Sequence, residues 1–208
     1  GAGSGTQAEQ TARIMVEFEK DLMANPTNLV VVVGDVTSTM ACTIVAKKLL
    51  TKVAHVEGGI RSFDLAMPEE INRLVTDSIA DYFFTTTLIA NQNLIKAGVE
   101  EKRIFFVGNT MIDTLLAHLP MATQPTWWRE LALESKGYLV LTMHRPSNVD
   151  DASKFAQWMQ SIDRAVDVPV VFPVHPRTQK SFDGLTDRPK RIFTREPLSY
   201  LEFIYLLN

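Results

Sequence analysis

Residues 29–59 read LVVVVGDVTSTMACTIVAKKLLTKVAHVEGG, and this stretch decides the fold class. The run at 29–33 consists of leucine and valine and predicts a short buried strand, as does the run at 53–56. Between them, residues 38–50 have the length and apolar spacing of a helix. A strand, a helix and a second strand in this order form a βαβ unit, and such units build parallel sheets.

The same alternation of strands and helices continues on both sides of this stretch. Further helices are predicted at residues 6–24, 69–79, 88–97 and 111–119, and further strands at 82–85 and 104–107. Together they form an N-terminal α/β domain, residues 1–119, which opens without a first strand. Residues 120–137 contain Pro125 and the pair Trp127-Trp128, break the alternation, and predict a connector with a short helix.

A second α/β domain is predicted at residues 138–208. Its expected elements are strands at 138–142, 168–174 and 191–194, a helix at 152–166, and a final helix that begins near Ser199. These strands are too few to close a core of their own, and the chain ends inside a predicted helix. We therefore expect an incomplete second domain, in a fragment with little catalytic activity of its own.

The composition is that of an ordinary globular protein. The 208 residues are 46% hydrophobic and 22% charged, with a net charge of −3 and no basic stripe, so no nucleic-acid partner is expected. The apolar runs are far shorter than the ~20 residues that a membrane span needs. Cys42 is the only cysteine, which excludes an internal disulfide. We expect a cytoplasmic protein without membrane attachment.

Charged residues gather in the stretch HVEGGIRSFDLAMPEEINR, residues 55–73. Glu57 follows a predicted strand, at the carboxyl end where ligands bind in open parallel sheets. Pro68 suits the first turn of a new helix, and acids are favoured after it by the positive helix N-terminus. The charged residues after His55 are Glu57, Arg61, Asp64, Glu69, Glu70 and Arg73. Their combination predicts a reaction centre, whereas the alternative is an ordinary helix start with Arg73 paired to Glu69.

Asp35 stands at the carboxyl end of the predicted strand 29–33, in the same position relative to its strand as Glu57. A catalytic carboxylate and a helix-capping aspartate are both consistent with this place. Thr37 is expected to begin the next helix with a capping hydroxyl, and Ser38 offers a second one. His55 lies inside a predicted strand and is interpreted as a packed core histidine.

Two histidines follow strands of the second domain. His144, with Arg145 beside it, follows strand 138–142, and His175 follows strand 168–174. A histidine next to an arginine combines an adjustable donor with a fixed cation, which suits a diphosphate. The alternative is that each imidazole only bonds loop backbone. The scattered histidines and the single cysteine predict no metal site, and no complete GxGxxG or Walker-type loop is present.

Several segments closely resemble the non-hydrolysing UDP-N-acetylglucosamine 2-epimerases. They are VVVGDVTSTMA, HVEGGIRSFDLAMPEEINRLVTDSIADYFFTTT, IFFVGNTMID, LTMHRPSNVD and FPVHPRT, and the likeness covers nearly the whole chain. The resemblance implies two Rossmann-like parallel-sheet domains of glycosyltransferase-B type, the second incomplete here. It also implies interconversion of UDP-GlcNAc and UDP-ManNAc by a homodimer, without a cofactor. The family's GTRPE-like phosphate loop and SGG-Q-E segment are not found, so uridine-binding residues are not assigned.

The resemblance further implies roles for individual residues. Asp35, Glu57 and Glu69 would be the acid/base carboxylates, and His144 a catalytic residue near the diphosphate. The expected substrate ligands are Arg61, Arg73, Arg145 and His175. Gly58 departs from the alanine common in the family, which leaves the chemistry untouched but is expected to loosen the turn.

The implied reaction is anti elimination of UDP to 2-acetamidoglucal, followed by re-addition of UDP. Proton donors or acceptors on both faces of the sugar ring would explain several carboxylates, each tuned by its surroundings. Three alternatives stay open: a glycosyl-transferring or hydrolysing enzyme of the same architecture, a 2-epimerase of a related UDP-2,3-diacetamido sugar, and a catalytically silent binding or assembly module.

Overall fold

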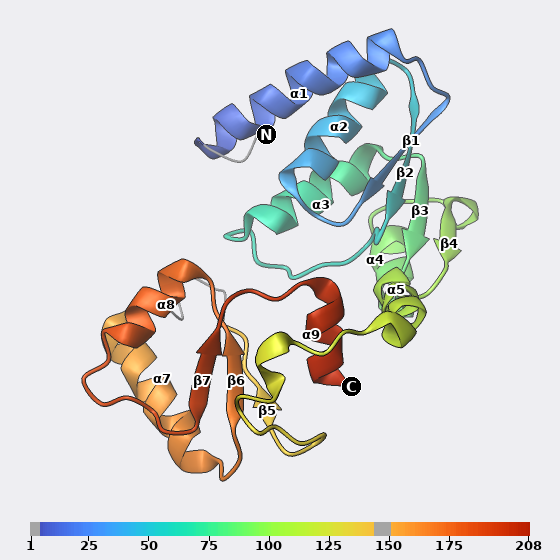
Figure 1. Cartoon of the computed structure of the whole chain (residues 1–208). Coiled ribbons are helices and arrows are strands. Elements are labelled where there is room, and N and C mark those ends of the chain that lie inside the picture. The colour runs from blue at the N-terminus through green and yellow to red at the C-terminus, as the bar shows by residue number, and fades with distance from the viewer. Residues whose placement is uncertain (1–4, 144–150) are drawn as a thin grey trace. The chain divides into compact units, whose positions relative to one another are not determined.

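The computed structural model describes residues 5–143 and 151–208, apart from the side chains of residues 176 and 177. The chain divides into two compact units, Gly1–Asp113 and Thr114–Asn208, called here the N-terminal and the C-terminal unit (Figure 1). Each unit contains its own parallel sheet. The predicted domain limits at residues 119 and 137 stay predictions.

The N-terminal unit is a four-stranded parallel sheet in the order β1-β2-β3-β4 (Figure 1). Its strands are β1 (Leu29–Val33), β2 (Lys52–Val56), β3 (Tyr82–Thr85) and β4 (Ile104–Phe106). Its helices are α1 (Gln7–Ala24), α2 (Thr37–Lys48), α3 (Pro68–Ile79), α4 (Leu88–Lys96) and the 3-10 turn η1 (Glu101–Arg103), and α5 (Thr110–His118) follows. The predicted elements therefore all form, with bounds within two residues of those expected.

The N-terminal core lies between the sheet and its helices. Helix α2 packs on β1 and β2 and is flanked by α1 and α3, whereas α4 packs on β3 and β4. The buried residues of this core are Leu22, Val32, Ala46, Val53, Ala80, Phe83 and Leu94. Val32, Val53 and Phe83 thus anchor β1, β2 and β3 in this core, and the partly buried Ile104 of β4 packs against it.

The starts of the N-terminal helices confirm one sequence prediction, for Pro68, and contradict another, for Thr37 and Ser38. Thr6 caps α1 in a capping box with Glu9, and Pro68 occupies the first turn of α3. The expectation that Thr37 or Ser38 caps α2 was wrong, because Val36 is the N-cap residue and makes no side-chain cap bond. Thr39 donates instead from Oγ1 to the Val33 carbonyl, 2.7 Å away, and ties the helix to the end of β1.

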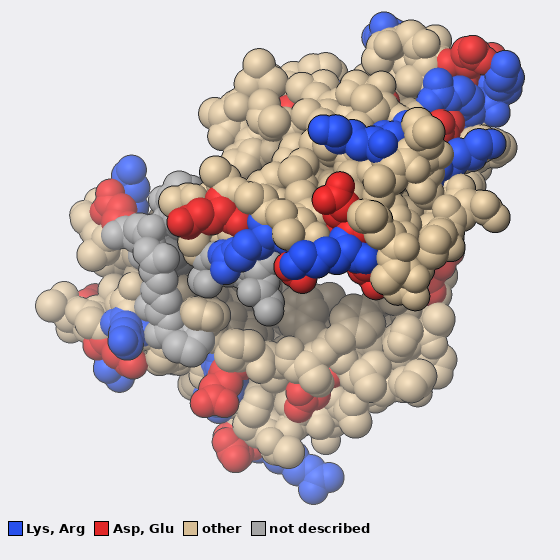
Figure 2. Space-filling model, turned by 90° about the horizontal axis from the view of Figure 1, so that it is seen from above, with Lys and Arg blue, Asp and Glu red and all other residues tan. Residues whose placement is uncertain are grey.

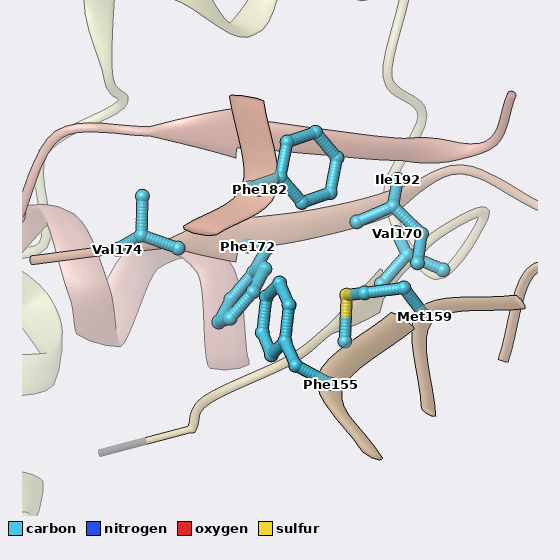
Figure 3. Close-up of a cluster of buried hydrophobic side chains, with 7 residues drawn as sticks. All are labelled: Phe155, Met159, Val170, Phe172, Val174, Phe182 and Ile192. Atoms are coloured by element: carbon cyan, nitrogen blue, oxygen red, sulfur yellow. The ribbon is translucent and has the colours of Figure 1, made fainter. Parts of the chain in front are cut away.

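The C-terminal unit is a three-stranded parallel sheet in the order β5-β6-β7. Its elements are the 3-10 turns η2 (Leu119–Met121) and η3 (Thr126–Trp128), β5 (Leu139–Val140), α7 (Ala152–Ala165), β6 (Val170–Pro173), α8 (Pro176–Asp183), β7 (Ile192–Arg195) and α9 (Tyr200–Leu207). One face of β6 meets Phe155 and Met159 of α7 and Phe182 of α8 in a dry cluster (Figure 3). A second cluster joins Val171 to Trp128, Leu133 and Leu206.

Two features of the C-terminal unit differ from the sequence prediction. Helix α8 was not predicted, and β5 is shorter than the expected strand 138–142. The predicted short helix near the tryptophan pair is the turn η3.

Two features of the structure concern membrane spans and surface charge. Among the described residues, no helix is long and apolar enough to cross a membrane. Acidic and basic side chains are interspersed on the face drawn in Figure 2.

Candidate active site

The carboxyl ends of β1 and β2 place Asp35 and Glu57 next to each other. Val33 and Val56 are register partners in the parallel ladder, so the residues that follow them leave the sheet at the same edge. Gly34 donates its N–H to the Val56 carbonyl at 3.0 Å. A Cβ placed on Gly34 would lie 3.7 Å from Oε2 of Glu57. The Glu57 carboxylate therefore reaches across to the end of β1 at Gly34, the residue before Asp35.

The backbone at this edge has left-handed torsions at both strand ends. Glu57 has φ +69° and Gly34 has φ +68°. For a residue with a side chain this torsion is uncommon and costs of order 1–3 kcal/mol. The Glu57 N–H donates to the Phe84 carbonyl at 2.9 Å, which anchors the strained residue to β3. Such strain is typical of functional sites, where it aims a side chain.

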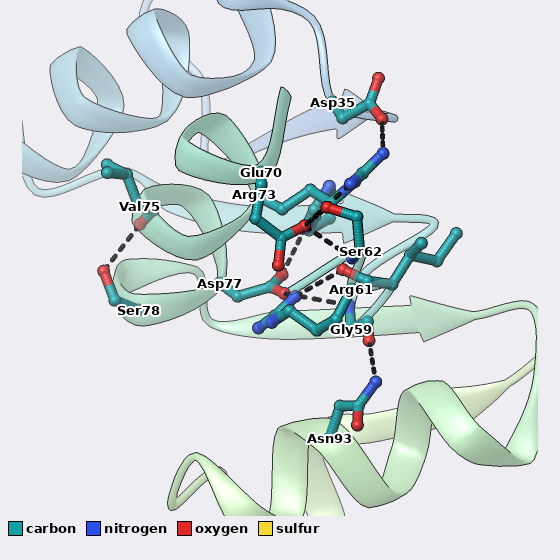
Figure 4. Close-up of polar contacts among 12 residues, drawn as sticks. Asp35, Gly59, Arg61, Ser62, Glu70, Arg73, Val75, Asp77, Ser78 and Asn93 are labelled. Atoms are coloured by element: carbon teal, nitrogen blue, oxygen red, sulfur yellow. Dashed lines mark hydrogen bonds and ion pairs between the residues drawn. The ribbon is translucent and has the colours of Figure 1, made fainter. Parts of the chain in front are cut away.

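Arg73 on α3 joins Asp35, after the end of β1, to the helix (Figure 4). Its Nη2 donates to Oδ2 of Asp35, and its Nη1 donates to Oε2 of Glu70 at 2.9 Å. The Asn72 side chain donates to the Asp35 backbone carbonyl at 2.8 Å. Helix α3 thus holds Asp35 by both its side chain and its backbone.

Glu70 is the buried anion of this cluster, with its side chain only 2% exposed. Burial opposes its ionisation, but hydrogen bonds from the Ser62 N–H, Arg73, the Ser62 hydroxyl and the Phe63 N–H outweigh burial and lower its pKa to about 2. The alternative pairing of Arg73 with Glu69 was therefore wrong, because Arg73 pairs with Glu70, three residues earlier. Glu70 fixes Arg73 and folds the loop at Ser62 and Phe63 onto α3.

Glu57 and Glu69 differ from Glu70, because neither has a bonding partner among the described residues. Both side chains are half-buried, and within residues 5–143 and 151–208 neither carboxylate has a hydrogen bond or an ion pair. A carboxylate that is partly desolvated and not bonded by other protein groups is available to exchange protons with a bound molecule.

Arg61 and His55 belong to a second, buried polar cluster, in which both bond Asp77. Arg61 has a side chain only 7% exposed and donates from Nη1 to Oδ2 of Asp77 at 2.6 Å (Figure 4). His55 is 1% exposed, as expected of a core histidine, and its ring bonds Asp77 and the Gly34 carbonyl. The predicted role of Arg61 as a substrate ligand stays a prediction.

Of the three site residues predicted in the C-terminal unit, the structure describes only His175. His144 and Arg145 lie outside the described residues. His175 is exposed and lies between β6 and α8, where its backbone carbonyl accepts from the Gln179 N–H at 3.0 Å. The structure thus brings together Asp35, Glu57 and Arg73 in the N-terminal unit.

Sequence reasoning missed the roles of Glu70 and Asp77. A signal was present, because Glu70, Arg73 and Asp77 follow one another at the i, i+3 and i+7 spacing of a single helix face. A charged stripe on the buried face of a helix predicts paired ions, since isolated charges are not kept there.

A sequence model of the family described as UDP-N-acetylglucosamine 2-epimerase matches residues 1–208. The chain is 41% identical over 217 residues to the UDP-N-acetylglucosamine 2-epimerase of Methanocaldococcus jannaschii, covering 98% of this chain and 59% of that protein. It is 36% identical over 209 residues to the UDP-2,3-diacetamido-2,3-dideoxy-D-glucuronate 2-epimerase of Pseudomonas aeruginosa, covering 98% of this chain and 57% of that protein.

The chain belongs to the UDP-N-acetylglucosamine 2-epimerase family. The resemblance seen in the sequence is thereby confirmed. The chain spans about 59% of the length of the curated relatives that it matches.

Solved structures of the family agree with the fold. The complex of the M. jannaschii UDP-GlcNAc 2-epimerase with UDP-GlcNAc and UDP matches with a TM-score of 0.84 at 42% identity, over 99% of this chain and 59% of that one. The Neisseria meningitidis UDP-GlcNAc 2-epimerase matches with a TM-score of 0.87 at 24% identity, over 99% of this chain and 58% of that one. The predicted fold class, two Rossmann-like parallel-sheet units of glycosyltransferase-B type, is confirmed.

Proposed function

We propose that this protein is a UDP-N-acetylglucosamine 2-epimerase that interconverts UDP-GlcNAc and UDP-ManNAc. The observation that carries the proposal is the pair of carboxylates, Asp35 and Glu57, at the carboxyl edge of a parallel sheet in a member of this family. The activity is a proposal because the chain spans only part of the length of its relatives.

Asp35, Glu57 and Glu69 are the proposed acid/base groups. Glu57 and Glu69 are half-buried and have no protein partner within the described part of the chain, which suits proton transfer with a substrate. Arg73 holds Asp35 in place and offers a cation at the same edge. His144, Arg145 and His175 are proposed to contact the diphosphate.

The proposed reaction is an elimination followed by an addition. A carboxylate removes the C2 proton while the C1–O bond breaks, and the electron pair of that bond leaves with UDP. The product of this step is 2-acetamidoglucal, with a double bond between C1 and C2. A carboxylic acid then delivers a proton to the opposite face of C2 as UDP adds again to C1, so no redox cofactor is needed.

Incubation with UDP-GlcNAc in D₂O tests this reaction. We expect UDP-ManNAc with deuterium at C2, because the removed proton exchanges with solvent before the second step. Retention of the original hydrogen in the epimerised product would exclude the elimination route. Release of free ManNAc together with UDP would instead identify a hydrolysing enzyme.

A second candidate substrate should be tested in the same assay. One relative of 36% identity is named as a 2-epimerase of UDP-2,3-diacetamido-2,3-dideoxy-D-glucuronate. We propose UDP-GlcNAc as the substrate because the relative of 41% identity is named for it. A kcat/KM that is higher for the diacetamido uronate would reverse this choice.

A homodimer in the cytoplasm is also proposed, from the family resemblance and from the composition. Light scattering of the purified protein tests the assembly. A mass of one chain at all concentrations would contradict the dimer.

A further inference from the structure

His55, Asp77 and Arg61 form a buried charged cluster that supplies none of the proposed acid/base groups. Their side chains are 1%, 3% and 7% exposed. His55 comes from β2, Asp77 from α3, and Arg61 from the loop between them. Three ionisable groups so far from solvent are costly to bury unless each has a partner.

The bonds of the cluster define what each group donates. His55 Nε2 lies 2.9 Å from the Gly34 carbonyl, which can only accept, so this nitrogen is the donor. Asp77 Oδ2 accepts from the Gly59 N–H at 3.0 Å and from Arg61 Nη1 at 2.6 Å. His55 Nδ1 lies 2.7 Å from Asp77 Oδ1, so the ring bonds both Asp77 and the Gly34 carbonyl.

The backbone atoms in this cluster belong to the residues that aim the two carboxylates. Gly34 directly precedes Asp35, and its carbonyl is held by His55. Gly59 lies two residues after Glu57, and its N–H is held by Asp77. On the other side, Asn93 of α4 donates to the Gly59 carbonyl at 3.0 Å (Figure 4). A single carboxylate on α3 thus links both strand-end turns.

We propose that Asp77, His55 and Arg61 are positioning residues that set the spacing between the Asp35 and Glu57 carboxylates. Buried ion pairs contribute little stability compared with apolar residues of the same size, whereas geometry accounts for this arrangement. The inference rests on the proposed function, because it takes Asp35 and Glu57 as the reacting groups. Small displacements of such groups cost up to about 10²-fold in rate.

The test compares Asp77→Asn with Asp81→Asn in the full protein. Asp81 is the matched control, because it also bonds a cation, Lys47, and a backbone N–H. That N–H belongs to Val53 at the start of β2, whereas the Gly59 N–H bonded by Asp77 follows the end of β2. We expect Asp77→Asn to lower kcat for C2 epimerisation by at least 10-fold with KM changed less than 3-fold. Asp81→Asn is expected to lower thermal stability and leave kcat within 2-fold.

Two substitutions of Arg61 distinguish a positioning role from a packing role. Arg61→Lys keeps a cation near Asp77, whereas Arg61→Met keeps only the apolar stem. We expect Arg61→Lys to retain several-fold more kcat than Arg61→Met. Equal kcat values for the two variants, or a kcat for Asp77→Asn that matches the Asp81→Asn control, would overturn the proposal. If Asp77→Asn does not fold, the Arg61 pair decides alone.

A measurement without turnover distinguishes failure of this inference from failure of the proposed function. In ¹⁵N-labelled protein we expect to observe the Nε2–H of His55, because the Gly34 carbonyl accepts from it. We also expect Arg61→Met to shift the amide signals of Gly34, Asp35 and Glu57, and Asp81→Asn to leave them unchanged. Unshifted signals would overturn the positioning network, whereas shifted signals in a protein without epimerase activity would overturn only the proposed function.

Discussion

The Glu57 carboxylate offers the sharpest test of the site at the scale of one residue. We expect Glu57→Gln to lower turnover by about 10²-fold or more, because positioned acid/base groups contribute that much and an amide cannot take a proton from carbon. Steady-state epimerisation of UDP-GlcNAc by the folded variant measures this. Glu100→Gln is the control, since Glu100 is exposed and pairs only with a surface lysine, Lys102. Near-normal turnover by Glu57→Gln would remove it from the proposed machinery.

Gly59 supports this site by its lack of a side chain. A Cβ there would lie 2.4 Å from the Ala90 carbonyl oxygen, in a residue with φ +83°. We expect Gly59→Ala to lower the free energy of unfolding by about 2–4 kcal/mol, from overpacking added to a strained torsion. Urea denaturation measures the change.

Gly98 provides a matched control for Gly59. It has φ +89°, but a Cβ placed on it would meet nothing within 4 Å. Gly98→Ala therefore carries only the torsional strain, of order 1 kcal/mol. If both variants lose the same free energy of unfolding, the contact with Ala90 has no role.

At the scale of one residue, the sequence predicts where a side chain lies better than it predicts which group that side chain bonds. The strand-end rule correctly placed Asp35 and Glu57 at one edge, because that edge follows from strand polarity alone. Whether Arg73 bonds Glu69 or Glu70 depends on the loop at Ser62, whose backbone donates to Glu70. That loop is fixed by tertiary contacts, so helix spacing alone does not distinguish the two.

At the scale of one element, Glu70 on helix α3 makes the stability of the fold depend on pH. The pKa of Glu70 lies near 2 in the folded protein, below its ordinary value of 4.5, so the ionised form stabilises the fold. This contribution, about 3 kcal/mol, is present above pH 4.5 and is lost as the pH falls toward 2. Between pH 6 and pH 3 we expect Glu70 to account for a loss of about 2 kcal/mol.

Glu70→Gln is the variant that isolates this effect. It cannot ionise, so the difference in free energy of unfolding between wild type and variant should shrink as the pH falls from 6 to 3. Urea denaturation at several pH values follows it. A difference that stays constant over this range would show that the Glu70 carboxylate is not the group responsible.

Elements with a clear apolar pattern were predicted, and one without it was missed. The predicted bounds of β1 and β3 are those of the structure, since each is a compact apolar run between turn residues. Helix α8 escaped prediction because its sequence, PRTQKSFD, is mostly polar, and among its described side chains only Thr178 and Phe182 are buried. Its apolar stripe is too narrow to be seen without the core on which Phe182 packs.

At the scale of the whole molecule, each unit has a core of its own. The expectation that the strands of the second domain are too few to close a core was therefore wrong, because β6 packs on α7 and α8. Leu94 is fully buried in the N-terminal core, and Met159 is fully buried in the C-terminal one. All three tryptophans, Trp127, Trp128 and Trp158, lie in the C-terminal unit. Tryptophan fluorescence therefore reports on that unit, whereas far-UV circular dichroism reports on the helices of both.

Unfolding of the two units can be separated with a pair of core variants. Leu94→Ala and Met159→Ala each leave a cavity and cost about 2–5 kcal/mol in the core that contains them. If the units unfold independently, Met159→Ala lowers the denaturant midpoint seen by fluorescence, and Leu94→Ala leaves it unchanged while lowering part of the circular dichroism transition. We expect this outcome, because each sheet packs against a buried core of its own. A fluorescence midpoint that moves equally in both variants would mean that the two cores unfold as one cooperative structure.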